Sequence, residues 1–274
     1  MNKRLVLIIT GLLVLLIAFT VFIFLYTKKG KAPIADKEGM VGTASSLLSQ
    51  AKDLEAKSDL LDAKSLYQRL VAEFSNSSEV MNWQKKIEDI NIKLLFSPNI
   101  TPKSRLYEIK PGDTLSKIAK EFKTTTELIM KSNHLPSDKI VPGRKIKVWT
   151  APFNILIDKS QNTLILKTDE EMIKTYIVST GKNNSTPIGN FKITNKLSNP
   201  AWFKTGAVVP PGSPENILGT RWLGFDLPGY GIHGNTEPNK LGQQVTQGCV
   251  RMSNTDAEEL YSIVPVGTEV TIVD

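Results

Sequence analysis

The sequence predicts a multidomain chain that begins with a transmembrane helix and continues through a small all-α segment and a small βααβ unit to a mostly-β domain. Three observations lead to this fold class. The chain has 274 residues, enough for about two or three domains. Its N-terminus carries a long apolar run without charges, and helical periodicity follows that run. The C-terminal part of the chain, residues 152–274, instead contains many short alternating segments.

The apolar run extends from Leu5 to Tyr26 and contains 22 residues without a charge. A helix rises about 1.5 Å per residue, so this length spans a hydrocarbon core of about 30 Å. Neither the shorter apolar core nor the small-residue cleavage site of a signal peptide is present. We therefore expect residues 1–29 to form an uncleaved single-pass anchor, although basic residues flank both ends of the run and do not fix its orientation.

Composition limits the partners of the chain. The formal net charge is +7, which favours an anionic partner such as a membrane surface, a cell wall or nucleic acid. No Arg-rich helix or basic–aromatic stripe accompanies the charge, so we expect no nucleic-acid binding. With one Cys and two His in the chain, an internal disulfide is impossible and a structural metal site or other cofactor is not expected.

The segment from Ser45 to Leu95 has apolar residues at spacings of three and four, which is typical of helices. Polar breaks at Lys57–Asp59 and Ser75–Ser78 divide it into three runs. The middle run resembles one degenerate tetratricopeptide unit, and such repeats normally need several copies to bury a core. We interpret residues 41–97 as a helical, TPR-like spacer that holds the rest of the chain away from the membrane, in preference to a protein-docking module.

The next segment alternates strand and helix signals within about 45 residues. Tyr107–Lys110 alternates like a strand, and Asp113 or Thr114 can cap a helix that follows the turn. A second helix is predicted at Thr126–Ser132, and Ile146–Val148 closes the unit as a strand. The order of elements is strand, helix, helix, strand.

Residues 105–149 resemble a LysM domain. The resemblance depends on Tyr107, Gly112–Leu115, Ile118–Ala119, Asn133, Leu135 and Pro142–Gly143. It implies binding to glycans that contain N-acetylglucosamine, such as peptidoglycan, in a groove between two loops. The positions that it assigns to the glycan are Gly112, Asp113, Thr114, Asn133 and Leu135.

Residues 152–274 are predicted to be mostly β. The predicted strands are Asn154–Ile157, Thr163–Leu166, Lys174–Val178, Phe191–Ile193 and Glu269–Val273. One late helix is expected where Ser253 or its neighbours precede an acidic first turn and the apolar Leu260 and Tyr261. Many short strands and one late helix indicate a β-sandwich or barrel.

The same segment contains the one Cys of the chain and one of its two His. A thiol near its usual pKa of about 8.5 needs a base to attack an acyl carbon, and imidazole is the natural partner. His233 lies 16 residues before Cys249, and glycines flank both residues, so substrate and backbone can approach closely. Arg251 adds a positive charge two residues after the thiol. The pair predicts a nucleophilic cysteine site, whereas the simpler interpretation is a buried Cys beside a structural turn.

Residues 154–273 resemble the YkuD-type L,D-transpeptidases. The motifs are Ile232–Asn235, Leu241–Gly242 and Thr246–Met252, with further matches at Ser179–Gly181, Thr186–Phe191 and Pro265–Val270. Gln247 stands where many members have a second His, which leaves His233 as the candidate base. The resemblance implies acyl transfer within peptidoglycan and, with it, acylation of Cys249 by carbapenems.

The mechanism implied by the resemblance uses four catalytic positions. His233 takes the thiol proton while the Gly234 carbonyl orients the imidazole, and Cys249 attacks the peptide carbonyl before the terminal D-amino acid. Backbone N–H groups of Gly248 and Cys249 are candidate oxyanion donors. An amine of a neighbouring stem then resolves the thioester and forms a 3→3 cross-link.

Substrate contacts are expected from Asn235, Gln247 and Arg251. For Arg251, a contact with a substrate carboxylate and a structural ion pair are equally compatible with the sequence. The Pro- and Trp-rich segment from Asn195 to Arg221 is expected to include a lid over the cleft. The modules together predict a bacterial protein in the cell membrane whose catalytic body faces the wall outside.

Three other functions remain open. Water could resolve the same thioester, which would make the chain an L,D-carboxypeptidase that trims stem peptides. A sortase also combines His, Cys and Arg, but Gln247–Gly248–Cys249 does not match the sortase motif. A wall-binding protein without activity would not need His233 and Cys249 in these glycine settings.

Overall fold

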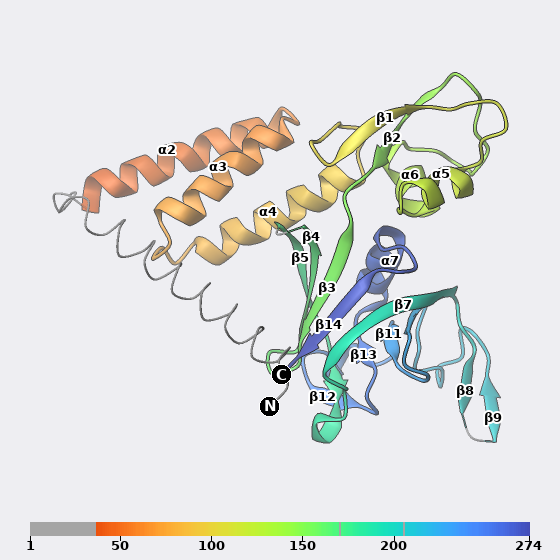
Figure 1. Cartoon of the computed structure of the whole chain (residues 1–274). Coiled ribbons are helices and arrows are strands. Elements are labelled where there is room, and N and C mark those ends of the chain that lie inside the picture. Colours follow the sequence, from red (N-terminus) through yellow and green to blue (C-terminus); the bar gives the residue numbers. More distant parts are fainter. Residues whose placement is uncertain (1–36, 170, 205) are drawn as a thin grey trace, which may run out of the picture.

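The computed structural model describes residues 37–169, 171–204 and 206–274 (Figure 1). The predicted anchor, Leu5 to Tyr26, lies outside these described residues. Within the described ranges, no helix is both long enough and apolar enough to cross a membrane.

Three consecutive helices form the N-terminal part: α2 (Lys37–Ala56), α3 (Leu60–Glu73) and α4 (Val80–Leu95). The two polar breaks expected from the sequence separate them. They bury one apolar cluster, whose members are Leu47, Ala51, Ala63, Tyr67, Leu70, Trp83, Ile87, Ile90 and Leu94. Burying this stripe stabilises helices that have little intrinsic preference to form alone.

Helix α4 covers strand β5 (Glu171–Ile177), which is an edge of the main sheet. Asn91 Nδ2 donates to the carbonyls of Met172 and Ile173, at 3.2 and 3.0 Å, and the Thr175 N–H donates to Glu88. These bonds satisfy backbone groups that an uncovered edge would leave open to pairing with another chain. The helices therefore dock on the C-terminal domain, and their role as a spacer from the membrane stays a prediction.

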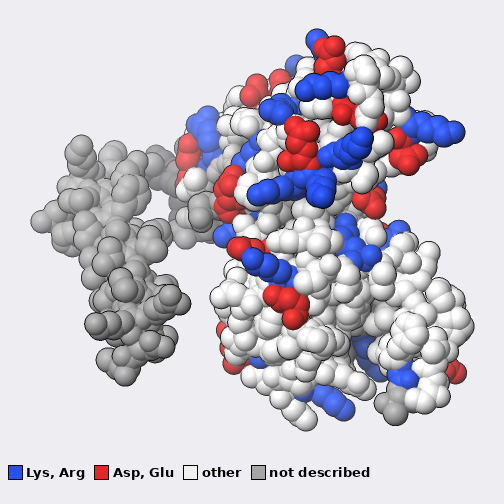
Figure 2. All heavy atoms as spheres, turned by 45° about the vertical axis from the view of Figure 1, so that its right-hand side comes forward, with Lys and Arg blue, Asp and Glu red and all other residues white. Residues whose placement is uncertain are grey.

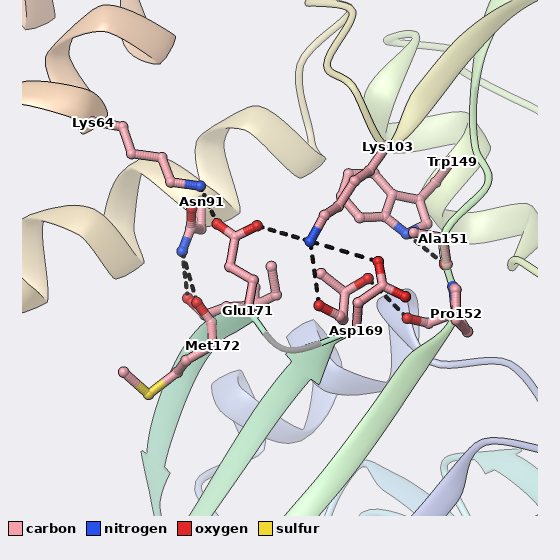
Figure 3. A network of polar contacts seen from close by, with 11 residues as sticks. Lys64, Asn91, Lys103, Trp149, Ala151, Pro152, Asp169, Glu171 and Met172 are labelled. Atoms are coloured by element: carbon pink, nitrogen blue, oxygen red, sulfur yellow. Dashed lines mark hydrogen bonds and ion pairs between the residues drawn. The ribbon is translucent and has the colours of Figure 1, made fainter. Parts of the chain in front are cut away.

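A polar network at Glu171 strengthens this docking (Figure 3). Lys103 Nζ lies 2.8 Å from one Glu171 oxygen, and Lys64 of α3 binds the other oxygen. Lys103 also donates to the Thr168 carbonyl at 3.2 Å. Burial by itself would raise the pKa of Glu171, but the hydrogen bonds and charges of the two lysines lower it overall. The Glu171 carboxylate thus connects helix α3, the segment just before β1 and the main sheet.

The βααβ unit consists of β1 (Ser104–Glu108), α5 (Leu115–Glu121), α6 (Thr126–Ser132) and β2 (Lys145–Trp149). Strands β1 and β2 pair antiparallel. Thr114 and Thr125 cap the two helices by accepting the Lys117 and Leu128 N–H groups, at 3.2 and 2.9 Å. The order of elements and the bounds of the second helix agree with the sequence prediction.

Lys147 of β2 is buried at the junction between the βααβ unit and α4, with 1 % of its surface exposed. Its ammonium donates to the Leu94 carbonyl at the end of α4 and, at 2.8 Å, to the Ser97 carbonyl. A cation there satisfies carbonyls that the helix leaves free and faces the negative end of the helix dipole. Burial nevertheless lowers the pKa of Lys147 to about 8.

This burial makes the stability of the chain depend on pH. The folded-state pKa of Lys147 is about 8 and its ordinary value is 10.5, so between these pH values the unfolded chain binds more protons and stability rises with pH. Relative to Lys147→Met, the wild type should gain up to about 3 kcal/mol between pH 8 and 10.5. Urea unfolding of both proteins across this range measures the difference, and a constant difference would contradict the buried cation.

The C-terminal domain is built on one curled sheet of eight strands in the order β13-β11-β10-β7-β14-β3-β4-β5. In chain order these strands are β3 (Phe153–Asp158), β4 (Thr163–Thr168), β5, β7 (Gly189–Ser198), β10 (Arg221–Phe225), β11 (Gly231–His233), β13 (Val250–Arg251) and β14 (Glu269–Val273). The prediction of a sandwich or barrel is corrected to a single main sheet. The predicted late helix is α7 (Asn254–Ile263), which Ser253 caps by accepting the Asp256 N–H at 3.0 Å.

Smaller elements complete the domain. Strand β6 (Thr180–Gly181) pairs with β12 (Gln244–Thr246), and β8 (Trp202–Lys204) pairs with β9 (Ala207–Val209) as a projecting hairpin (Figure 1). The main core packs α7 against the sheet and also includes Leu95, Leu128 and Trp149 from the preceding parts. The described parts therefore share one apolar interior.

Candidate active site

Strand pairing places the predicted reactive residues on one face of the sheet. Strands β11 and β13 run parallel, with Ile232 opposite Val250 and His233 opposite Arg251. Side chains alternate along a strand, so the fully buried Ile232 and Val250 face the core. His233, Cys249 and Arg251 all line a cavity on the other face of these strands.

This cavity has a volume of about 670 Å³. The sheet and the loop before β13 contribute Leu197, Trp222, Gly229, Tyr230, His233, Val245, Thr246, Gln247, Cys249 and Arg251. The other wall comes from Pro200, Ala201, Trp202, Phe203, Ile217 and Leu218. These residues belong to the segment that the sequence predicts as a lid, and β8 and β9 form its hairpin.

His233 is held as a neutral base with one nitrogen free. Its Nδ1 lies 2.8 Å from the Gly234 carbonyl oxygen, which can only accept, so Nδ1 carries the proton and Nε2 has its lone pair. The Trp222 ring stacks on the imidazole, with centroids 6.0 Å apart and planes inclined by 19°. Burial, helped by the charge of Arg251, lowers the pKa of His233 to about 4 despite the bond to Gly234. The imidazole is therefore uncharged at neutral pH.

Cys249 lines the cavity as a protonated thiol. Burial raises its pKa, and the Gly231 N–H and the charge of Arg251 offset this only in part. Its Sγ donates to the Gly229 carbonyl at 3.4 Å. Within the described part of the chain, no hydrogen bond joins Sγ to the His233 ring, so a side-chain rotation must bring them together. Catalytic hydrogen bonds are often formed only when substrate is bound.

The structure gives Gly248 a conformational role in place of the predicted oxyanion contact. Its N–H donates to Thr246 Oγ1 at 3.1 Å, and the Thr246 hydroxyl donates to the Cys249 carbonyl at 2.6 Å. Gly248 has φ +130°, and a Cβ there would lie 2.6 Å from the Tyr230 ring. The Cys249 N–H donates to no acceptor among the described residues and is the remaining candidate donor.

Asn254, the first residue of α7, fixes the loop that carries the Gly234 carbonyl. Its Oδ1 accepts the Thr220 N–H at 3.1 Å and the Asn235 N–H at 3.0 Å, and its Nδ2 donates to the Asn235 carbonyl at 2.8 Å. A Cβ on Gly234 would overlap the Asn254 side chain. The side chain thus sets the position of the carbonyl that orients His233.

We expect Asn254→Ala to destabilise the fold by about 2–4 kcal/mol, because two buried N–H groups and one carbonyl lose their partner. It should also lower kcat of the enzyme about tenfold, since His233 loses its orientation. Asn254→Asp, which keeps an acceptor for both N–H groups, should retain more of the stability. Urea unfolding and turnover measurements check these effects, and wild-type kinetics in Asn254→Ala would contradict the assigned role.

The three predicted substrate contacts occupy different environments. Gln247 is exposed and lines the cavity, as a substrate contact would. Asn235 is 6 % exposed and its Oδ1 accepts the Glu237 N–H at 2.6 Å, while its Nδ2 has no acceptor among the described residues, so its contact with substrate stays a prediction. Arg251 lines the cavity, and its Nη1 lies 3.1 Å from Glu237 Oε2. The structure thus contains the ion pair that the sequence left open.

In the βααβ unit, some of the predicted glycan contacts are exposed, whereas the others form contacts within the unit itself. Gly112, with φ +85°, and Thr114 are exposed. Asp113 accepts the Tyr107 hydroxyl at 2.9 Å and so fixes the turn. Asn133 bonds both the N–H and the carbonyl of Lys147, and Leu135 is 8 % exposed in the core of the unit. The Asn133 side chain and most of Leu135 are thus used inside the unit, and the assignment of all five residues to glycan binding stays a prediction.

Sequence reasoning missed four residues that build the site, namely Trp222, Tyr230, Thr246 and Asn254. Thr246 lies within the quoted cysteine motif, so its position was a usable signal. No local pattern marks the other three, which depend on strand pairing. No cluster of three or more His, Cys, Asp and Glu within the described ranges could hold a metal ion.

A buried neutral histidine and a thiol above one cavity of a curled sheet define a cysteine–histidine enzyme, here attached to a small βααβ unit. Residues 152–272 match the family of the YkuD L,D-transpeptidase catalytic domain, and residues 107–149 match the LysM domain. The chain belongs to the YkuD family of L,D-transpeptidases.

Three known proteins illustrate the similarity. YkuD of Bacillus subtilis, named as an L,D-transpeptidase, is 36% identical over 173 residues, which cover 61% of this chain and 97% of that protein. YqjB of the same organism is 40% identical over 126 residues, 44% of this chain and 70% of that protein. A solved L,D-transpeptidase from Mycobacterium tuberculosis H37Rv superposes with a TM-score of 0.40 and 16% identity, over 50% of this chain and 75% of that one.

Proposed function

We propose that this peptidoglycan L,D-transpeptidase forms 3→3 cross-links between stem peptides through a thioester on Cys249. The observation that carries the proposal is the common cavity of Cys249 and His233, in which the imidazole is neutral and its Nε2 is free. A neutral imidazole can accept a thiol proton, and a protonated thiol needs such a base.

The proposed reaction starts with transfer of the Cys249 proton to His233 Nε2. The thiolate attacks the carbonyl that links the third stem residue to the terminal D-amino acid. The imidazolium then gives its proton to the leaving amine, the C–N bond breaks, and the D-amino acid departs. A side-chain amine of a neighbouring stem attacks the thioester, and the thiol re-forms as the amide does. The number of amide bonds is unchanged, so no energy source is required.

The Gly234 carbonyl holds the imidazolium during this cycle, since Nδ1 keeps its proton throughout. The stacked Trp222 ring fixes the imidazole plane. The Cys249 N–H is the proposed donor to the oxyanion of the tetrahedral intermediate, where one such donor contributes about 10²–10³ in rate.

The LysM domain supports binding to peptidoglycan, and we propose that it holds the glycan strand whose stems reach Cys249. The domain is joined to α4 by the buried hydrogen bond from Lys147 Nζ to the Leu94 carbonyl, and to α7 by the one from the Thr125 hydroxyl to the Ser262 carbonyl. Figure 2 shows lysines and arginines mixed with acidic side chains on the upper part of one face, above a mostly uncharged lower part. This face therefore presents no continuous basic stripe.

We also propose that residues 1–29 anchor the chain in the cell membrane with the catalytic body outside. The support is the uncharged run from Leu5 to Tyr26, together with a peptidoglycan substrate outside the membrane. Protease treatment of intact cells tests the orientation. Digestion of the body in unbroken cells is expected, and protection until lysis would contradict the proposal.

Product analysis tests the activity. The whole chain in detergent is incubated with purified disaccharide tetrapeptide, and the products are separated and weighed by mass spectrometry. Cross-linked dimers that lack one D-Ala are expected. Tripeptide monomers alone would instead indicate the L,D-carboxypeptidase, and unchanged tetrapeptide would refute both activities.

A further inference from the structure

Arg251 is the one permanent charge among the described residues that line the active-site cavity. His233 and Cys249 are uncharged at neutral pH, and none of the remaining lining residues is an Asp, Glu, Lys or Arg. Arg251 and Cys249 are two residues apart on the same face, which corresponds to about 6–7 Å along a strand. A cation is thus fixed close to the nucleophile.

The guanidinium of Arg251 has fewer partners than it can use. The residue is 6 % exposed, and within the described ranges its polar partner is Glu237, through Nη1 at 3.1 Å. Its Nε is buried and has no acceptor among the described residues. A guanidinium has five N–H donors and usually binds a carboxylate through two of them side by side. A buried donor without an acceptor is costly, so the site favours a second carboxylate contact.

Glu237 is placed so that it can leave Arg251. It is 44 % exposed, and it lies in the surface turn just before the short helix at residues 238–240. Its other carboxylate oxygen lies 2.6 Å from Lys240 Nζ. A rotation toward solvent would break one bond and keep the pair with Lys240. The Glu237 carboxylate is partly exposed, so it returns to water when a substrate carboxylate replaces it on the buried guanidinium.

The substrate of the proposed function, on which this inference rests, brings such a carboxylate. The leaving D-amino acid ends in a free carboxylate, which is separated from the scissile carbonyl by one nitrogen and one Cα. Its carbon therefore lies within about 4 Å of the carbon that Cys249 attacks. A fifth residue on the stem would move the carboxylate about 3.5 Å further away.

We infer that Arg251 binds the carboxylate of the leaving D-amino acid, and that Glu237 is the displaceable stand-in for this carboxylate in the empty enzyme. The donor stem displaces Glu237 from Arg251, and its carboxylate then binds Nε and Nη2 of Arg251 side by side. When the D-amino acid has left, Glu237 pairs with Arg251 again and disfavours rebinding of the product. This exchange selects donors that end one residue after the scissile carbonyl.

Two matched donors test the inference with the whole chain in detergent. One is a tetrapeptide with a free terminal carboxylate, and the other is the same peptide with a terminal carboxamide. Release of D-Ala or D-alaninamide gives kcat/KM for each. The wild type should prefer the acid by about 10–100-fold, the range of a charge-assisted hydrogen bond. Arg251→Gln should reduce this preference to about threefold or less, while Arg251→Lys should keep part of it.

Glu237→Gln, which removes the competing carboxylate but keeps its shape, should lower KM for the acid donor severalfold and leave that for the amide unchanged. Equal use of both donors by the wild type would overturn the inference, even if no Arg251 variant folds. An equal loss on both donors in a folded Arg251→Gln would also overturn it, since Arg251 would then act only as a structural partner. Release of neither leaving group by the wild type would instead refute the proposed function.

Discussion

Replacement of Cys249 by alanine is expected to lower the rate of D-Ala release from tetrapeptide donors by about 10⁴-fold or more. Removal of the nucleophile from a group of catalytic residues that depend on one another typically has an effect of this size. The change should leave the fold intact, because Cys249 is half-buried at the cavity and its one side-chain bond is a weak contact with Gly229. Quantification of free D-Ala after incubation with wild type and variant measures the effect.

Cys249→Ser is the matched control for shape. A hydroxyl is a much weaker nucleophile than a thiol at neutral pH, so this variant should be almost as inactive as Cys249→Ala. The same variants should show no mass increase with a carbapenem, in contrast to the wild type. Activity above a tenth of the wild-type rate in either variant would mean that another group forms the acyl-enzyme.

Replacement of His233 by glutamine is expected to lower kcat about 10³-fold, because the thiol has a raised pKa and loses its base. The pH dependence of the wild type is the more specific result. The pKa of His233 is lowered to about 4, chiefly by burial, so the imidazole remains a base well below pH 6.5. We expect kcat/KM to stay constant from pH 7 to about pH 5 and to decrease when the pH is lowered below about 4.

A variant of Arg251 serves as the control for this pH profile, because the positive charge of Arg251 contributes to the lowered pKa of His233. Arg251→Gln should move the acid limb to higher pH, provided that circular dichroism shows a folded protein at each point. A wild-type midpoint near pH 6.5 would indicate that the imidazole is solvated during catalysis. That result would contradict the buried neutral base.

Most elements of the fold were predictable where their apolar period is long. The three helices, the βααβ unit, the consecutive strands β3, β4 and β5 and the late helix α7 all follow from spacing and caps. The strands that carry the site were not predicted, because β10, β11 and β13 have two to five residues and two of them contain glycine. Their pairing depends on the sheet as a whole, and so does the choice of one curled sheet.

The docking of the helices was also beyond the sequence. It depends on single polar contacts such as Asn91 with the carbonyls of β5 and Lys147 with the end of α4. In a sequence, a buried lysine or asparagine looks like any exposed polar residue, so the spacing of apolar residues does not show that it is buried.

For the site, His233, Cys249 and Gly234 could be named from the sequence, because their motif is compact and matches a known family. The residues that hold His233 in position could not be named from the sequence. Trp222 lies on a neighbouring strand and Asn254 begins a helix, and both reach His233 or its loop only through tertiary packing. The same holds for Glu237, whose contact with Arg251 joins a surface turn to strand β13, 14 residues further along the chain.

The most direct test of the cysteine–histidine account is to trap the acyl-enzyme. The whole chain is mixed with a tetrapeptide donor that carries no acceptor amine, quenched in acid within seconds and digested for mass spectrometry. The account predicts a tripeptide acyl group on the peptide that contains Cys249, at the expense of one D-Ala, and a much lower yield in His233→Gln. Release of D-Ala with unmodified Cys249, or an acyl group on another residue, would contradict it.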